Sequence, residues 1–123
     1  MSKPMKSKAL GKVRVNSGIL AIIDPCIARF LDLSGDDFFE PARRKNGLYP
    51  FNYRGCSGAA QNKDQGGQLA DHEGGAGGGV AFHSGMGDGE YEVVATYKNF
   101  GPGIGERITK IEMTLIDDNF DKE

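Results

Sequence analysis

The chain begins with two segments that have the pattern of β-strands. In residues 12–15, two valines alternate with a lysine and an arginine, which is typical of a strand with one face in water. Residues 19–23 are apolar throughout and rich in isoleucine, which indicates a buried strand. The Asn-Ser-Gly sequence at 16–18 favours a turn. We therefore predict that 12–15 and 19–23 pair as a hairpin.

Asp24 and Pro25 mark the end of the second strand and the start of a helix. Proline has no N–H to donate to a sheet, and an aspartate just before it can cap a first helical turn. We predict a short helix over residues 25–33. Its core-facing side chains would be Ile27, Phe30 and Leu31.

Regular periodicity is lost between residues 34 and 79, where glycine, proline and asparagine are frequent. Loops longer than about 15 residues are uncommon in a compact domain unless they are functional or disordered. The one strand signal is Leu48 to Arg54, in which three aromatic residues share a face. The sequence otherwise predicts a long irregular insertion over 34–79, and Gly74 to Gly79 are predicted as a loop that leads into a strand.

Strand patterns return in the last third of the chain. Residues 80–84 and 90–98 are predicted as strands, and the Asp-Gly pair within Gly85 to Gly89 predicts that they join as a hairpin. One face of the second strand would carry Tyr91, Val93, Ala95 and Tyr97. Residues 106–118 fit both a helical and a strand period, but their many β-branched residues favour a strand.

Taken together, these elements predict a mainly β fold. We expect a small antiparallel β-sandwich or curled sheet of five to seven strands with one short helix and long glycine-rich loops. The chain has 19 glycines in 123 residues, a larger share than the average glycine content of about 7 per cent. These glycines show no collagen period. The length of 123 residues fits a single domain over 1–123, with residues 1–9 and 117–123 frayed.

Charge and hydropathy narrow the classes of partner. The formal net charge of -2 gives no overall field that would attract nucleic acid, so nucleic-acid binding is not expected. The longest apolar run, 19–23, is far shorter than the ~20 residues that cross a membrane, and the basic N-terminus lacks the apolar core of a secretory signal. We expect a cytoplasmic protein without membrane association. Cys26 is expected in the core and Cys56 at the surface, both as free thiols.

The best signal for a partner lies in residues 43–54. Four cations flank three aromatic residues at alternate positions, so groups that bind carboxylate or phosphate would lie beside flat rings that can stack. The predicted partner-binding residues are Arg43, Arg44, Lys45, Tyr49, Phe51, Tyr53 and Arg54. The pattern alone favours an ordinary structural role, in which the rings fill the core. In that role nearby carboxylates neutralise the cations, namely Asp36, Asp37 and Glu40.

A ligand site in the glycine-rich stretch is the alternative. Glycine-rich loops hold phosphate where amides converge at a helix N-terminus, but the glycines at 74–79 precede a strand and match no nucleotide motif. A calcium ion needs six to eight oxygens, more than the nearby carboxylates supply. The residues for an anionic nucleotide or a divalent cation would be Gly77, Gly78, Gly79, Asp24, Asp88 and Glu90. No resident metal or cofactor is predicted.

Catalysis finds little support in the sequence. The cysteines, histidines and aspartates can be combined into triads on paper, but their contexts match no nucleophile motif. No catalytic residue is predicted. An enzyme would need several of the reactive side chains to converge on one pocket, from among Asp24, Cys56, His72, His83 and Asp88.

Two stretches, "SGILAIIDPC" and "GMGDGEYEVVATY" followed by "GERITKIEMTLID", resemble a bacterial and phage family of unknown function. Its members combine an SGxLxxxDP strand end with a later GDGxYxV hairpin. The matching positions are Ser17, Gly18, Asp24, Pro25, Gly87, Asp88, Gly89, Tyr91, Val93, Arg107 and Ile108, which cover less than half of the chain. Ile27 and Glu92 stand where the family often has an aromatic residue and a proline. The resemblance implies a compact β fold and no established activity.

The functional expectation is therefore a non-catalytic binding module. Its partner would be a protein, and its setting a phage or mobile element whose product acts by occupying a host protein. A domain that binds a small ligand, such as a nucleotide, is the alternative, and self-association stays open.

Overall fold

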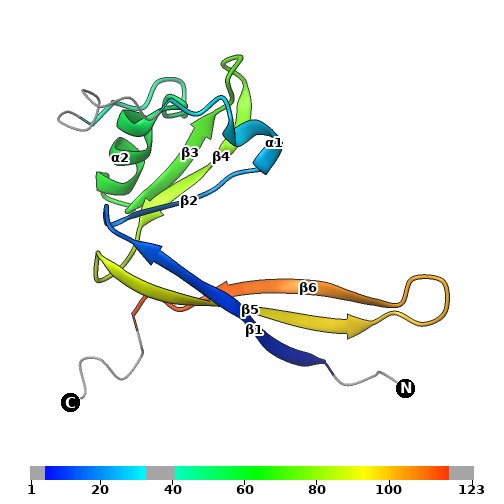
Figure 1. The fold of residues 1–123 in the computed structure, drawn as a ribbon. Helices are drawn as coiled ribbons and strands as arrows, with labels where there is room; N and C mark the ends of the chain where they lie inside the picture. The colour runs from blue at the N-terminus through cyan, green and yellow to red at the C-terminus, as the bar shows by residue number, and fades with distance from the viewer. Residues whose placement is uncertain (1–4, 33–40, 117–123) are drawn as a thin grey trace. The chain divides into compact units, whose positions relative to one another are not determined.

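The computed structural model describes residues 5–32 and 41–116, which form six strands and two helices (Figure 1). All the strand pairs between named strands are antiparallel, and they make two sheets of three strands each. This confirms the predicted mainly β, antiparallel fold. The chain divides into two compact units. Unit 1 consists of Met1–Val15 and Asp88–Glu123, and unit 2 of Asn16–Gly87.

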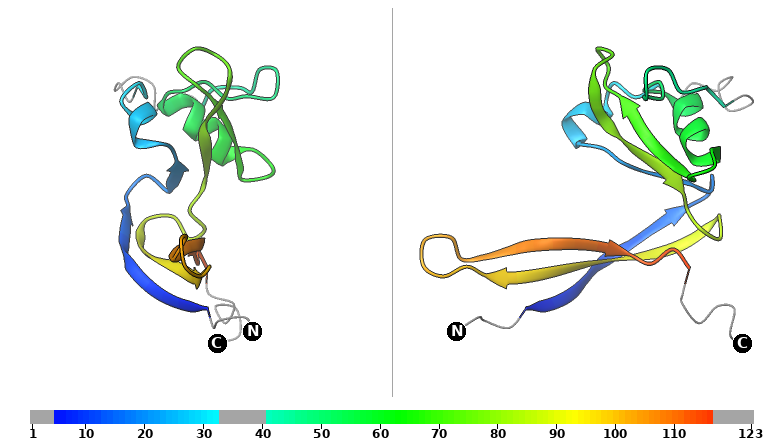
Figure 2. Two further views of the ribbon diagram at one scale, coloured as in Figure 1. Left: turned by 90° about the vertical axis from the view of Figure 1, so that its right-hand side faces the viewer. Right: turned by 180° about the vertical axis from the view of Figure 1, so that it is seen from behind.

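Unit 2 is a sheet covered by a helix. Its strand order is β2 (Ile19–Ile22), β4 (Ala76–His83) and β3 (Gly66–Ala70). Helix α2 (Tyr53–Gln61) packs against this sheet (Figure 2). The buried core lies between the two layers and consists of Tyr49, Cys56, Ala59, Leu69 and Ala81.

Helix α2 corrects the prediction of a strand at 48–54 and of an irregular insertion over 34–79. Asn52 caps the helix, since its Oδ1 accepts a hydrogen bond from the N–H of Gly55 at 2.8 Å. The residues from Gly55 to Ala60 are all small and buried. A Cβ atom on Gly55 would overlap the carbonyl oxygen of Pro50, and one on Gly58 would overlap that of Ala42. The glycines therefore let the segment 42–50 lie directly on the helix.

Unit 1 is a three-stranded sheet in the order β1 (Lys6–Val15), β5 (Gly89–Asn99) and β6 (Glu106–Met113). The strand predicted after residue 106 is confirmed. The cross-strand partners place Val93, Ala95 and Tyr97 opposite Met113, Ile111 and Ile108. The N-terminal fraying expected over 1–9 is wrong for residues 6–9, because β1 begins at Lys6. Residues 1–4 and 117–123, also expected to fray, lie outside the described residues.

Both predicted hairpins are wrong. Strand β1 pairs with β5 rather than β2, and Val15 lies opposite Gly89 at the end of that ladder. Strand β4 pairs with β2 and β3, so residues 85–89 do not join a hairpin. The turn signals mark real breaks in the strands, but a turn sequence does not by itself determine which strands pair. The break at Gly85 is stabilised by Ser84, whose N–H donates to the carbonyl of Gly18 and whose Oγ donates to that of Gly87.

Helix α1 (Pro25–Ala28) begins as predicted and ends early. Asp24 Oδ1 accepts a hydrogen bond from the N–H of Cys26 at 2.8 Å, which is the expected cap. The helix stops at Ala28 rather than near residue 33, and Phe30 is exposed instead of buried. The cysteines are free, but their predicted places are reversed. Cys26 is exposed and Cys56 is buried inside α2.

Within the described parts of the chain, neither helix has the length and apolar character that a membrane crossing requires.

Candidate functional site

The segment 41–50 is fixed at both of its ends. The N–H of Ala42 donates to the carbonyl of Arg54 at 2.9 Å. At the other end, the N–H of Tyr49 donates to the carbonyl of Gln68, and the N–H of Ala70 donates to the carbonyl of Tyr49. The segment thus lines the outer edge of β3 and lies across α2.

A tight turn lies between these two anchors. Lys45 and Leu48 exchange both backbone hydrogen bonds, at 2.8 and 3.0 Å. Asn46 and Gly47 between them have φ angles of 54° and 82°, as a type I′ turn requires. Asn-Gly is the preferred pair for this turn, so the sequence itself determines this part of the site.

Tyr49 belongs to the core rather than to an exposed surface. Its side chain is enclosed by two glycines, since a Cβ on Gly67 would lie 2.7 Å from Cε2 and one on Gly58 would lie 3.1 Å from Cδ1. Its hydroxyl accepts a hydrogen bond from Asn62 Nδ2 at 2.7 Å. Phe51 packs against the same core, and Tyr53 is the first residue of α2. Tyr49 and Phe51 therefore take the core-filling role that the pattern favoured, and the three rings do not form an exposed row for stacking.

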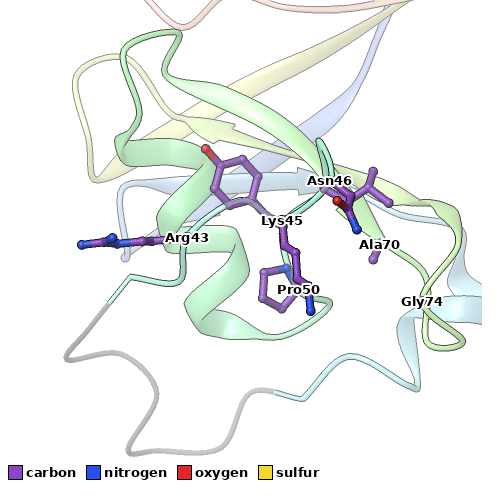
Figure 3. Close-up of a pocket in the computed structure, with 8 residues that line it drawn as sticks. Arg43, Lys45, Asn46, Pro50, Ala70 and Gly74 are labelled. Atoms are coloured by element: carbon purple, nitrogen blue, oxygen red, sulfur yellow. The ribbon is translucent and has the colours of Figure 1, made fainter.

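Two cavities adjoin this segment, and both are lined by Arg43 and Tyr49. The first has a volume of about 440 Å³, and its further walls include Lys45, Leu48, Pro50 and Ala70 (Figure 3). The second has a volume of about 490 Å³, and its further walls include Arg44, Gly58, Gln61 and Asn62. Figure 3 shows that Arg43 and Lys45 extend in different directions from the chain.

The cations at these cavities have no counter-charge within the described residues. Arg43, Arg44 and Lys45 are exposed, and none of them makes an ion pair with another described residue. The carboxylates that were expected to neutralise them, at 36, 37 and 40, lie outside the described residues. We call Arg43, Arg44 and Lys45, together with the two cavities, the cationic surface.

Of the seven predicted partner-binding residues, the structure brings four together at the cavities: Arg43, Arg44, Lys45 and Tyr49. Phe51, Tyr53 and Arg54 are half-buried and do not line them. Sequence reasoning missed the walls formed by Ala70 and by the end of α2. The one sequence signal for the wall at the end of α2 was Asn52, which is a suitable helix cap. A helix that starts there brings residues 61 and 62 to the site.

The residues of the alternative ligand site serve other purposes. Gly77, Gly78 and Gly79 lie within β4, where a Cβ on Gly78 would overlap the carbonyl oxygen of Ala70. These glycines allow close strand contact, so the loop predicted over 74–79 is wrong from Ala76 onward, whereas Gly74 and Gly75 do lie in a turn before the strand. Asp24 caps α1 in unit 2, whereas Asp88 and Glu90 belong to unit 1. Among the residues that the structure describes, no three His, Cys, Asp or Glu side chains gather as metal ligands would.

The reactive side chains do not meet at these cavities. Burial raises the pKa of the Cys56 thiol by desolvation, against a smaller lowering effect of a backbone hydrogen bond, so the thiol stays protonated at neutral pH. His72 stacks on Phe30 with ring centroids 3.9 Å apart, and the Nδ1 of His83 is buried without a hydrogen-bond partner in the described chain. Neither cysteine and neither histidine lines either cavity of the cationic surface.

Comparison with known proteins gave no match: no family model fits the sequence, and neither the curated proteins nor the solved structures contain a significant relative. The family resemblance of the sequence motifs therefore stays a prediction.

Proposed function

We propose that this chain is a non-catalytic binding module that holds an acidic segment of a partner protein on the cationic surface. The observation that carries the proposal is the set of three cations beside two adjoining cavities, unpaired within the described residues. Arginine presents a planar fork of donors that matches a carboxylate, and lysine adds a point charge. Such a surface attracts carboxylates of a partner. Because the three cations are exposed, binding there requires no change in the buried core.

The backbone beneath the cations supports this proposal. Hydrogen bonds anchor the segment at Ala42 and Tyr49, and the hydrogen-bonded turn at 45–48 fixes the backbone between these two anchors. The close contacts at Gly55 and Gly58 also hold the segment against α2. A surface that is already ordered loses less conformational entropy on binding, so more of the interaction energy appears as affinity.

The enclosed state of Tyr49 favours a protein over a nucleic acid as the partner. Proteins that bind single strands stack bases on exposed rings, but this ring is 5% exposed and its hydroxyl is already bonded. Three neighbouring cations are also few for a backbone of phosphates, and the net charge of the chain is -2. Nothing in the geometry favours the alternative small-ligand site, because its glycines lie within β4.

Fluorescence polarisation with labelled peptides tests the proposal. Peptides rich in Asp and Glu should bind more tightly than matched peptides with Asn and Gln, and added salt should weaken the binding because the contact is between exposed charges. The double variant Arg43→Glu/Arg44→Glu should lower the affinity at least about tenfold, or ~1.4 kcal/mol. Its melting temperature should stay close to that of the parent, because exposed substitutions change stability by about 0.5 kcal/mol or less.

The matched control is Lys8→Glu/Lys63→Glu, which changes the net charge by the same amount at two exposed positions that line neither cavity. It should reduce the affinity only slightly. Equal losses in the two double variants would show that net charge alone attracts the peptides. Equal affinities for acidic and amide peptides would contradict the proposal outright.

A further inference from the structure

The two cavities differ in their walls, and the difference defines the partner more narrowly. Resting on the proposed function, we infer that the bound segment is an extended peptide in which a carboxylate lies beside an apolar side chain. The arginines hold the carboxylate, and the first cavity takes the apolar side chain, such as leucine or phenylalanine.

The first cavity has apolar walls and a cationic rim. Leu48, Pro50 and Ala70 form its walls, while Arg43 and Lys45 provide the charge. Its volume of about 440 Å³ lies within the range of roughly 300–1,000 Å³ that is usual for ligand pockets. A purely charged ligand would leave these apolar walls in contact with water. An apolar side chain would remove them from water and gain affinity in proportion to the area covered.

The donors that line the second cavity indicate that the arginines bind the carboxylate of the peptide. Asn62 has no free donor there, because its Nδ2 donates to both Tyr49 Oη and the carbonyl of Gly66. Its Oδ1 accepts from the N–H of Asp64, and Gln61 Nε2 donates to Ser57 Oγ. Gln61 keeps one neutral N–H, and the charged donors beside this cavity are the guanidinium groups of Arg43 and Arg44, which form the stronger hydrogen bonds to a carboxylate. A carboxylate bound here would therefore take its hydrogen bonds from these groups.

The backbone between the cavities favours a peptide over a free anion. The N–H and C=O groups of Arg43 and Arg44 make no hydrogen bond to any described residue. Extended peptides gain affinity by pairing their own backbone with such groups, while side-chain pockets on either side provide specificity. A peptide backbone lying along Arg43 and Arg44 would reach both cavities, since Arg43 lines both.

Titration of the whole 123-residue chain with two acidic peptides of equal charge tests the inference. One peptide carries a single leucine beside the acidic residues, and the other has serine at that position. The leucine peptide should bind about tenfold more tightly, which corresponds to burial of roughly half of a leucine side chain. The variant Ala70→Phe fills the first cavity and should abolish this preference. Ala9→Phe, at an exposed position of β1 that lines neither cavity, is the control and should preserve it.

The outcomes separate this inference from the proposed function. Equal binding of the two peptides, with loss in Arg43→Glu/Arg44→Glu, would overturn the apolar anchor and leave the acidic site standing. Failure of both peptides to bind would overturn both. Tighter binding of a single-stranded oligonucleotide of equal charge would overturn the peptide class. Should Ala70→Phe fail to fold, Leu48→Ser provides the second variant, because a polar wall should reduce the preference for leucine.

Discussion

The close contact between α2 and the segment 42–50 predicts that an alanine at Gly58 lowers the stability of the protein. Replacing a helical glycine by alanine normally stabilises a helix by about 1 kcal/mol. At Gly58 the new Cβ would overlap the carbonyl oxygen of Ala42 and lie 3.1 Å from Tyr49 Cδ1. Overpacking of a core costs roughly 1–3 kcal/mol, and we expect about 3 here because the obstacle is backbone rather than a flexible side chain.

The variant Gly58→Ala should therefore lose about 2 kcal/mol of unfolding free energy, which is roughly 10 °C in melting temperature for a domain of this size. Urea denaturation followed by circular dichroism measures it. Gly11→Ala is the matched control, since a Cβ there has no neighbour within 4 Å and the φ angle is not in the left-handed region. The control should leave stability almost unchanged. A Gly58→Ala protein as stable as the parent would refute the close packing that positions the cationic surface.

Three further predictions concern single side chains. Tyr49→Phe removes the acceptor of the 2.7 Å bond from Asn62 and should cost about 1 kcal/mol in denaturation, whereas a neutral result would contradict that bond. Asp24→Ala should cost about 1 kcal/mol by removing the cap of α1, and Asp24→Asn should restore most of it. Because burial raises the pKa of Cys56 above its ordinary 9.0, the unfolded thiol ionises first and the unfolding free energy should fall as pH rises above about 9. Cys56→Ala should remove that decline, and Cys26→Ala should not.

The strands could be predicted from the sequence, but their partners could not. Alternation in 12–15 and apolar character in 19–23 locate the end of β1 and the whole of β2, because both patterns are local properties of the sequence. The predicted burial of 19–23 is wrong, since β2 is an edge strand and Ile22 is 70% exposed. Pairing depends on contacts between distant segments. The turn at 16–18 therefore suggested a hairpin, although β1 and β2 belong to different sheets.

Helix α2 escaped prediction for a different reason. Its apolar face is made of small residues such as Cys56 and Ala59, which give a weak signal in the sequence, and its two glycines disfavour a helix in isolation. Packing against the sheet and the segment 42–50 outweighs that preference. For the candidate site too, local features could be predicted from the sequence and contacts between distant segments could not. Its cations were evident from residues 43–45, but the cavity walls at Leu48, Pro50 and Ala70 combine two segments that only the fold brings together.

The pairing of Val15 with Gly89 has a consequence for the architecture of the chain. The chain leaves unit 1 after Val15 and re-enters it at Asp88, and Val15 pairs with the next residue, Gly89, in the ladder of β1 and β5. Unit 2 is thus an insertion into the first hairpin of a three-stranded meander, with an entry and an exit only one strand spacing apart, about 5 Å. Insertions with adjoining ends leave the register of the host strands intact, so unit 2 can change in length or be exchanged for a short turn without altering how β1 and β5 pair.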